Sequence, residues 1–470
     1  MLSSPTRRIS RLASLVIVVP AIAFFLVFGG FLLAMTPPYA GLDEPYHWQR
    51  VLQIAEGDLL AETLGPNSWG GPIDRAGYLH MLHYFELIQK HAPVDAARAR
   101  ALSDHLASWP PERQVVPFPS SASFAPLAYL PQAAFVAAAR ALKRGPLDQM
   151  HAGRLGNLAG YGAMIAAILW ALPGARIAFL ALALSPVALQ SACTLSADPL
   201  NLTVPSLLLA LVWRYRDRGS PLGRGERAGL LALSAALGLL KLTIAPFAGI
   251  VLFLPGGPRS RLGFAGLCLA VAVGIAVLWN AAYPFLPGLY WGTGADPAAQ
   301  VARLRAAPLE ALQVFATTVR DYAWDWWRDG YGRYGGHPAP WSGYASTPWI
   351  MAALWVLPAL ALCDGARRRD PGIAGVTLLA APAYVLLVLA AFWVGFTPVG
   401  SATVLGVQGR YFLLAQVLVA LALAAASGSW PPPSVRRGLR LGLFAAALAL
   451  NGAVLVDVLT AWAALWVPAG

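Results

Sequence analysis

The sequence predicts an all-α polytopic integral membrane protein, a bundle of about 11 transmembrane helices with a large loop after the first. Hydrophobic residues make up 58% of the 470, charged residues only 12%, and the mean hydropathy is +0.59. Soluble domains carry about 25% charged residues, so lipid is the solvent for most of this chain. Arginines stand in short groups between apolar runs, so the net charge of +12 indicates membrane topology and no nucleic-acid partner.

The N-terminal segment, residues 1–35, predicts a cytoplasmic N-terminus and a first transmembrane helix. Arg7, Arg8 and Arg11 precede an apolar run from about residue 12 to residue 35. This run is longer than a signal-peptide core and lacks a small-residue cleavage site, so we expect it to remain uncleaved. Residues 36–151 then predict an extracytoplasmic loop with interfacial helices, including helix-like stretches at 77–90 and 96–107.

The remaining chain predicts a transmembrane core at 152–283, an aromatic extracytoplasmic loop at 284–346 and C-terminal transmembrane helices at 347–470. Residues 124–142 leave two alternatives open, a span or an interfacial helix, because prolines and polar residues interrupt them. If they do not cross, and 228–255 forms two short helices, 11 spans result and all four basic linkers are cytoplasmic. The linkers are residues 214–227, 259–261, 367–369 and 436–440.

A polar decapeptide, Gly41-Leu-Asp-Glu-Pro-Tyr-His-Trp-Gln-Arg50, directly follows the first span. If a helix begins near Glu44, then Asp43, His47 and Arg50 share one helix face at the water interface. In a purely structural interpretation, Asp43 caps the N-terminus of this helix, Pro45 lies in its first turn, and the charged side chains simply face water. The functional interpretation is a catalytic carboxylate at the outer membrane face.

Other polar groups in apolar surroundings fall on the same predicted outer face. Asp198 could cap a helix or act as a second acid in the same cavity. Lys241 interrupts an apolar stretch and must pair, snorkel or bind an anion such as phosphate. Gly406-Val-Gln-Gly-Arg-Tyr411 places Gln408, Arg410 and Tyr411 at the start of a late span. There the guanidinium could bind a phosphodiester, or simply lie at the interface.

Several chemistries lack their sequence signals. The chain has no P-loop, dinucleotide-binding glycine pattern, HExxH or GxSxG motif. Its three cysteines are widely separated in apolar runs and give neither a disulfide framework nor a zinc site. The spacing of His47, His80 and His83 does not require a metal, so no cofactor is predicted and a divalent metal is left open. Tyr322–Tyr331 carries aromatics and acids that suit either a sugar or any membrane interface.

With Asp43-Glu-Pro-x-His47, Ser196-Ala-Asp198 and Gly406-Val-Gln-Gly-Arg-Tyr411 in this order, the sequence resembles a bacterial family of predicted multispanning membrane proteins of unknown function. That family is grouped with the GT-C glycosyltransferases. The resemblance implies a GT-C-like core, a bacterial inner-membrane location, a polyprenyl-phosphate sugar donor and a glycan, lipid or protein acceptor.

Roles follow by position within this resemblance. Asp43 matches the catalytic acid, with Glu44 beside it, and His47 and Arg50 would order the site. Asp198 resembles a second acid, and Lys241 and Arg410 would bind the donor phosphate. Two other classes stay open: a transporter or flippase of envelope glycolipid precursors, and a non-catalytic envelope-assembly partner. A transporter is expected to show repeated halves and charges near the midplane.

Overall fold

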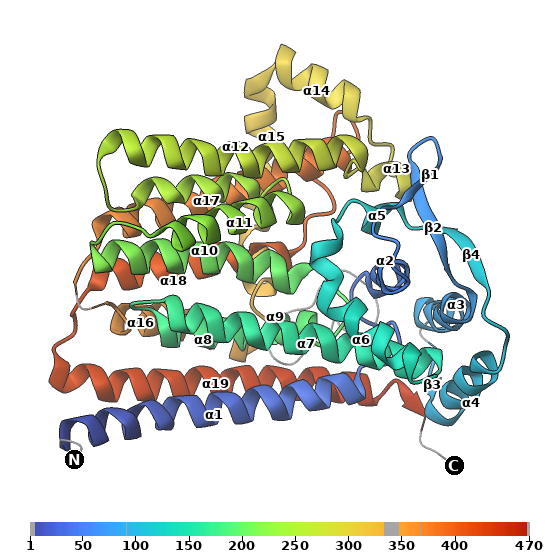
Figure 1. Cartoon of the computed structure of the whole chain (residues 1–470), viewed down its shortest axis with the longest axis horizontal. Helices are drawn as coiled ribbons and strands as arrows, with labels where there is room; N and C mark the ends of the chain where they lie inside the picture. The colour runs from blue at the N-terminus through green and yellow to red at the C-terminus, as the bar shows by residue number, and fades with distance from the viewer. Residues whose placement is uncertain (1–4, 91, 333–346, 367, 468–470) are drawn as a thin grey trace.

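The computed structural model describes residues 5–90, 92–332, 347–366 and 368–467. Long helices lie side by side from one end of the molecule to the other, and a small domain covers one end (Figure 1). Five of these helices are long and apolar enough to cross a membrane. The candidate spans lie in α1 (Pro5–Met35), α12 (Pro258–Ala282) with the residues up to Leu289, α17 (Pro371–Gly395), α18 (Leu413–Ser427) with the turn before it from Gly409, and α19 (Pro433–Ala463). The chain is a helical membrane protein, as predicted.

Other predicted spans form helices that are shorter or more polar. These are α7 (Pro146–Ala171), α8 (Arg176–Ala183), α9 (Pro186–Ala192), α10 (Asp198–Arg218), α11 (Arg224–Leu240) and α16 (Thr347–Cys363). The run predicted at 176–193 is interrupted before Pro186, and 244–255 is mostly a 3-10 helix, η2 (Ala245–Phe253). Nearly all residues of α8 and α9 are buried in the bundle. Irregular backbone is tolerated there because other helices shield it from lipid.

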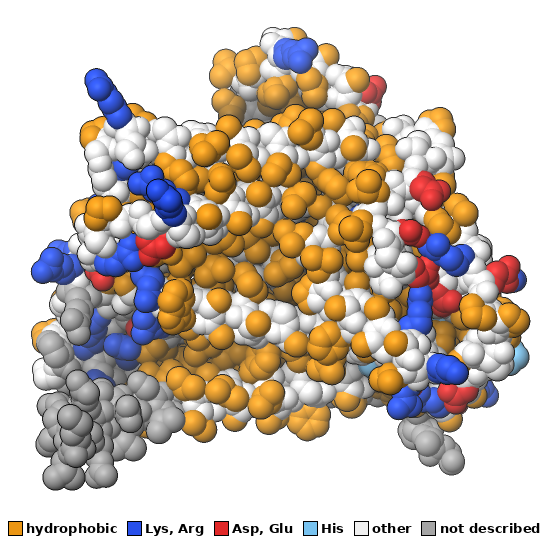
Figure 2. Space-filling view, viewed as in Figure 1, with side chains coloured by type: hydrophobic (Ala, Val, Ile, Leu, Met, Phe, Trp, Pro, Cys, Tyr) orange, Lys and Arg blue, Asp and Glu red, His pale blue; other side chains and the backbone are white. Residues whose placement is uncertain are grey.

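The described residues of the four basic linkers lie together at the end of the bundle opposite the small domain (Figure 1). Arg216 forms an ion pair of 2.6 Å with Asp370 and donates to the Phe253 carbonyl at 3.1 Å. Arg436 donates to the Cys363 carbonyl at 3.0 Å. Figure 2 shows basic side chains gathered at this end, with an apolar belt between it and the mixed charges of the other end. This grouping is the one that the spacing of the arginines predicts.

The small domain contains a sheet, so the all-α prediction is wrong for this part of the chain. Strands β1 (Glu62–Gly65), β2 (Ser68–Asp74) and β4 (Arg113–Pro117) form an antiparallel sheet in the order β1-β2-β4. The sequence pattern of a strand was obscured because β2 contains Gly70, Gly71 and Pro72, which are uncommon inside strands. At Gly70 a Cβ would lie 2.1 Å from the Val116 carbonyl oxygen, so only glycine allows this close approach.

Helices surround this sheet at the positions predicted from the sequence. They are α2 (Glu44–Ala55), α3 (Arg75–Gln89) and α4 (Ala96–Ala107). The chain then passes through α5 (Pro119–Ala122), η1 (Pro126–Tyr129) and α6 (Leu130–Ala141). Helix α6 has 12 residues, fewer than the about 20 that a crossing requires, and packs against α7 and α2. Short β3 (Val94–Asp95) pairs in parallel with β5 (Trp466–Val467).

The aromatic segment expected as a loop is largely helical. It forms α13 (Pro287–Trp291), α14 (Pro297–Ala306) and α15 (Pro308–Asp329), while 333–346 lie outside the described residues. Within α15 the Trp326 ring packs 5.0 Å from that of Phe412, and Tyr322 stacks on Trp326 at 6.0 Å. Part of this aromatic set therefore packs α15 against η4 (Gly409–Phe412), the turn that carries Arg410.

Candidate functional site

A guanidinium bridges two carboxylates at the end of the bundle beside the small domain. Arg410 of η4 forms an ion pair with Asp43, and its Nη1 lies 3.3 Å from Oδ2 of Asp198. The side chain of Arg410 is 5% exposed, whereas those of Asp43 and Asp198 are 45% and 25% exposed. The carboxylates are thus more exposed than the cation, whose burial strengthens its electrostatic interactions.

The backbone directs the Asp43 carboxylate into the space beside Arg410. Asp43 precedes α2 with φ 56°, in the left-handed region, and its side chain makes no capping hydrogen bond. The neighbouring acid Glu44 turns back along the chain, where its Oε2 accepts a hydrogen bond from the Gly41 N–H at 2.9 Å. A left-handed conformation costs a non-glycine residue about 1–3 kcal/mol and is often found at functional sites. The capping interpretation of Asp43 is therefore wrong.

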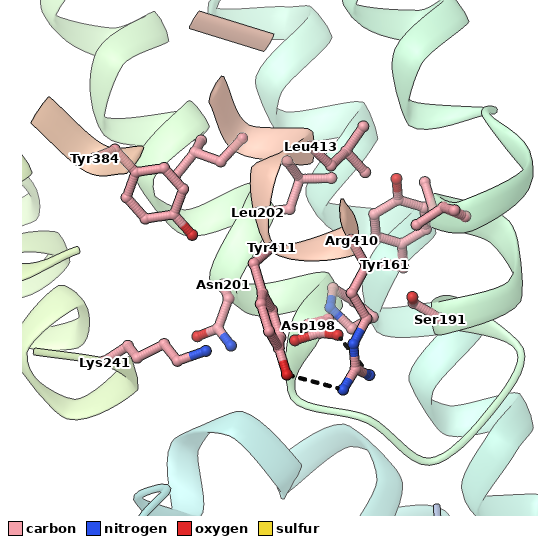
Figure 3. Close-up of a pocket in the computed structure, with 14 residues that line it drawn as sticks. Tyr161, Ser191, Asp198, Asn201, Leu202, Lys241, Tyr384, Arg410, Tyr411 and Leu413 are labelled. Atoms are coloured by element: carbon pink, nitrogen blue, oxygen red, sulfur yellow. Dashed lines mark hydrogen bonds and ion pairs between the residues drawn. The ribbon is translucent and has the colours of Figure 1, made fainter. Parts of the chain in front are cut away.

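Lys241 enters the same space from the opposite side. Helix α11 ends at Leu240, and Lys241 has an extended backbone, so the helix break expected near this residue is present. Its ammonium lies 5.0 Å from the Tyr411 ring centroid and 5.5 Å from that of Phe124. Figure 3 shows the amine directed toward Tyr411 and Asn201. Among the described residues, no carboxylate lies within 4.0 Å of it to form an ion pair.

These groups line one cavity of ≈ 330 Å³, which we call the charged cleft. Seven of the nine residues predicted for the site line it: Asp43, His47, Asp198, Lys241, Gln408, Arg410 and Tyr411. A smaller space of ≈ 30 Å³ continues behind Arg410 toward Tyr161 and Tyr384 (Figure 3). The cleft joins an acid pair to two cations at the boundary between the apolar belt and the polar end.

His47 forms part of the cleft wall as a neutral side chain. Its Nδ1 lies 2.7 Å from the Tyr129 hydroxyl, and its ring packs against Phe124. Burial lowers the pKa of His47 below its usual 6.5, because desolvation disfavours the imidazolium, although nearby Asp43 acts in the opposite direction. A neutral imidazole held by a tyrosine suits positioning of a substrate.

Glu44 and Arg50 point away from the charged cleft, in contrast to the sequence-based assignment. Glu44 is fully buried and receives Nε and Nη2 of Arg154 at 2.7 and 2.6 Å. It also accepts from the Leu195 N–H at 2.9 Å. Arg50 is buried in the small domain, where it donates to Gln53 and to the Leu59 carbonyl. We therefore infer that Glu44 connects the segment of Asp43 to the turn before Asp198. Arg50 stabilises the small domain.

A buried polar network behind the cleft was missed in the sequence analysis. Gln132 donates to the Ser196 carbonyl at 2.8 Å, and Asn157 donates to the Thr194 carbonyl at 2.6 Å. Both therefore hold the turn that leads to Asp198. The sequence did contain a signal for this network. Arg154 lies inside an apolar run, and a charged side chain in such a run of a membrane protein must have a polar partner.

The sequence left a divalent metal open. Within the part of the chain that the structure describes, no group of three or more His, Cys, Asp or Glu side chains is placed to hold a metal ion. Arg410 occupies the position between Asp43 and Asp198 that a bridging cation would take. The donor set in this conformation suits an arginine rather than a metal.

Fold and site together define a helical membrane protein with a charged cleft at one end of its apolar bundle. The chain belongs to the family described as predicted membrane protein (DUF2142), whose model matches residues 25–419. This range includes every residue that lines the charged cleft. The match confirms the predicted membership of a family of multispanning membrane proteins. No curated protein and no solved structure matches the chain.

Proposed function

We propose that this protein is an inverting membrane glycosyltransferase of the GT-C type. It would transfer a sugar from a polyprenyl-phosphate donor to a glycan, lipid or protein acceptor at the extracytoplasmic face. The observation that carries the proposal is the meeting of Asp43, Asp198, Lys241 and Arg410 in one cleft beside an apolar belt. A lipid-linked donor stays in the bilayer, so its phosphate can meet a water-borne acceptor only at such a boundary.

The cleft contains the groups that this reaction requires. Asp43 removes the proton of an acceptor hydroxyl, and the acceptor oxygen forms a bond to the anomeric carbon. The bond from that carbon to the phosphate oxygen breaks on the opposite side, and its electron pair leaves with the phosphate. Lys241 and Arg410 stabilise the negative charge on the departing phosphate. Inversion follows because attack and departure occur on opposite faces.

The ion pair between Asp43 and Arg410 adds an ordering requirement to this mechanism. A carboxylate bound to a guanidinium is a weaker base, because the cation favours its ionised form. The donor phosphate would compete with Asp43 for Arg410, since arginine binds phosphate and carboxylate with the same fork geometry. Donor binding would then release Asp43 to act on the acceptor.

The proposed orientation has the N-terminus in the cytoplasm, the charged cleft outside and 11 spans across the bacterial inner membrane. The basic linkers support it, because they gather at the end of the bundle opposite the cleft. In this arrangement α8, α9 and η2 contribute irregular crossing segments that other helices shield from lipid. The GT-C-like core at 152–283 then supplies Asp198 and Lys241.

The test is sugar release from a panel of polyprenyl-phosphate monosaccharides by purified protein in nanodiscs. Asp43→Asn should lower turnover by about 10²–10⁴, the usual contribution of a general base. The matched control is Asp104→Asn, because Asp104 is an exposed acid of α4 outside the cleft. Turnover unchanged by Asp43→Asn would overturn the assignment. If no donor is consumed while Arg410→Ala still alters envelope glycans in cells, transport or assembly becomes the better explanation.

A further inference from the structure

A second cavity, of ≈ 340 Å³, adjoins the charged cleft and has no role in the reaction described above. It lies between α11 with the segment that follows it (241–243), α12 and α17, and its walls are mainly apolar, with Leu239, Ala276 and Ala391 as examples. Protein interiors contain few voids larger than a water molecule, whose share of liquid volume is about 30 Å³. A cavity of this size is therefore large enough to hold part of a ligand.

The second cavity connects the charged cleft with the lateral face of the bundle. Phe124, Lys241, Phe285 and Phe392 line both spaces. At the lateral side, Leu242 and Leu387 border the cavity and are 44% and 36% exposed. The adjoining helices α12 and α17 expose leucines to their surroundings, as membrane-spanning helices do. A lipid can therefore enter from the bilayer without crossing a polar surface.

One polar side chain of this cavity is shared with the charged cleft. Lys241 stands at the junction, and Thr243 lies two residues further along the same irregular segment. Thr243 is 7% exposed, and its hydroxyl has no hydrogen-bond partner among the described residues. An ammonium and a buried hydroxyl two residues apart beside an apolar space match an anionic headgroup on an apolar chain.

We infer that this second cavity binds the first isoprene units of a polyprenyl phosphate, with the phosphate at Lys241 and Thr243. The inference rests on the proposed function, because it places the donor lipid of that reaction. The volume accommodates about 11 groups of water or methylene size, which is about two isoprene units of a single chain. A phospholipid has two chains joined near its phosphate, so a space of this volume favours a lipid with a single chain.

The experiment measures binding of sugar-free undecaprenyl phosphate to the full chain in nanodiscs. Ala390→Trp fills the cavity, and the matched control Ala383→Trp adds the same side chain to an exposed site of α17 outside it. We expect Ala390→Trp and Lys241→Met to weaken binding at least about tenfold. We expect Lys241→Arg and Ala383→Trp to retain it. Wild-type affinity in Ala390→Trp, or equal binding of phosphatidic acid, would overturn the inference.

A photoreactive polyprenyl phosphate with a diazirine on its second isoprene unit tests the same point in the unaltered chain. Adducts on the parts of α11, α12 or α17 that line the cavity support the inference, and adducts confined to other helices overturn it. Sugar turnover separates the two proposals. Wild-type turnover by Ala390→Trp overturns the lipid site alone. Cavity-dependent lipid binding without turnover of any sugar donor overturns the transferase alone.

Discussion

At the scale of single residues, the geometry of Arg410 explains why this position requires an arginine. One guanidinium reaches Asp43 and Asp198 at the same time, because its nitrogens spread in a rigid fork. Gly409 beside it is equally constrained, since a Cβ there would lie 2.6 Å from the Gly330 nitrogen. The turn can therefore present the arginine only because it packs tightly against the end of α15.

Arg410→Lys should separate the charge of this residue from its shape. A lysine keeps the positive charge but offers one ammonium in place of a fork, so it cannot bridge both acids and a phosphate. We expect donor turnover to fall about tenfold or more while the protein still folds, because a lost charged hydrogen bond is worth roughly 1.5–3 kcal/mol. Arg98→Lys, at an exposed arginine of α4, is the control. Equal turnover in both variants would show that charge alone suffices.

His80 gives the small domain a specific pH dependence. It is buried, its Nδ1 lies 2.9 Å from the Tyr39 hydroxyl, and burial lowers its pKa to about 4. The unfolded chain takes up this proton near pH 6.5, so stability falls as the pH decreases from 6.5 toward 4, by roughly 3 kcal/mol in total. His80→Gln should remove that component. Thermal unfolding in detergent at pH 7 and pH 4.5 measures it, and identical pH profiles would contradict the prediction.

At the scale of elements, the buried pair of Glu44 and Arg154 joins α7 to three other parts of the chain. Arg154 of α7 donates to the carbonyls of Thr36 and Pro37, each at 2.8 Å, as well as to Glu44. Glu44 in turn accepts from Leu195. The end of α1, the start of α2 and the turn before α10 are thereby fixed together. This connection sets the distance between Asp43, just before α2, and Asp198 of α10, although neither Glu44 nor Arg154 lines the cleft.

Glu44→Gln should therefore act through stability rather than through chemistry. Removing one partner of a buried pair leaves an uncompensated charge and costs about 3–5 kcal/mol of unfolding free energy. Glu44→Gln combined with Arg154→Met should recover part of this loss. Glu86→Gln, which breaks the exposed pair with Lys90, should cost less than about 1 kcal/mol. Denaturant unfolding provides the comparison, and a stable but inactive Glu44→Gln protein would return Glu44 to the catalytic group.

At the scale of the whole molecule, the sequence predicts which end of the bundle holds the site. Charges are costly in lipid, so Asp43, Asp198, Lys241 and Arg410 stood out, and counting the basic linkers placed all four on one face. The direction of a side chain is set by packing, which the sequence does not show. The sequence analysis therefore gave the adjacent residues Asp43 and Glu44 similar roles, although only Asp43 faces the cleft. The break between α8 and α9 could not be predicted from the sequence either. A broken helix that other helices shield from lipid has the same apolar composition as a straight transmembrane helix.

Labelling of single cysteines tests the proposed orientation. The native cysteines are all buried, which gives a low background for a membrane-impermeant maleimide. In intact cells, Asp104→Cys in the small domain should be labelled, and Arg216→Cys and Arg437→Cys in the basic linkers should not. Opening the cells should make the latter two reactive. Labelling of the linker positions in sealed cells would reverse the topology and place the charged cleft in the cytoplasm.

The ion pair between Asp43 and Arg410 also has a consequence for biosynthesis. The two residues are 367 positions apart, so at about 5–20 residues per second the ribosome delivers the arginine roughly 20–70 s after the aspartate. Throughout this interval the growing chain already carries the acid but lacks the cation that restrains it. Chains that terminate before η4 can therefore insert most of their helices and still possess no assembled site.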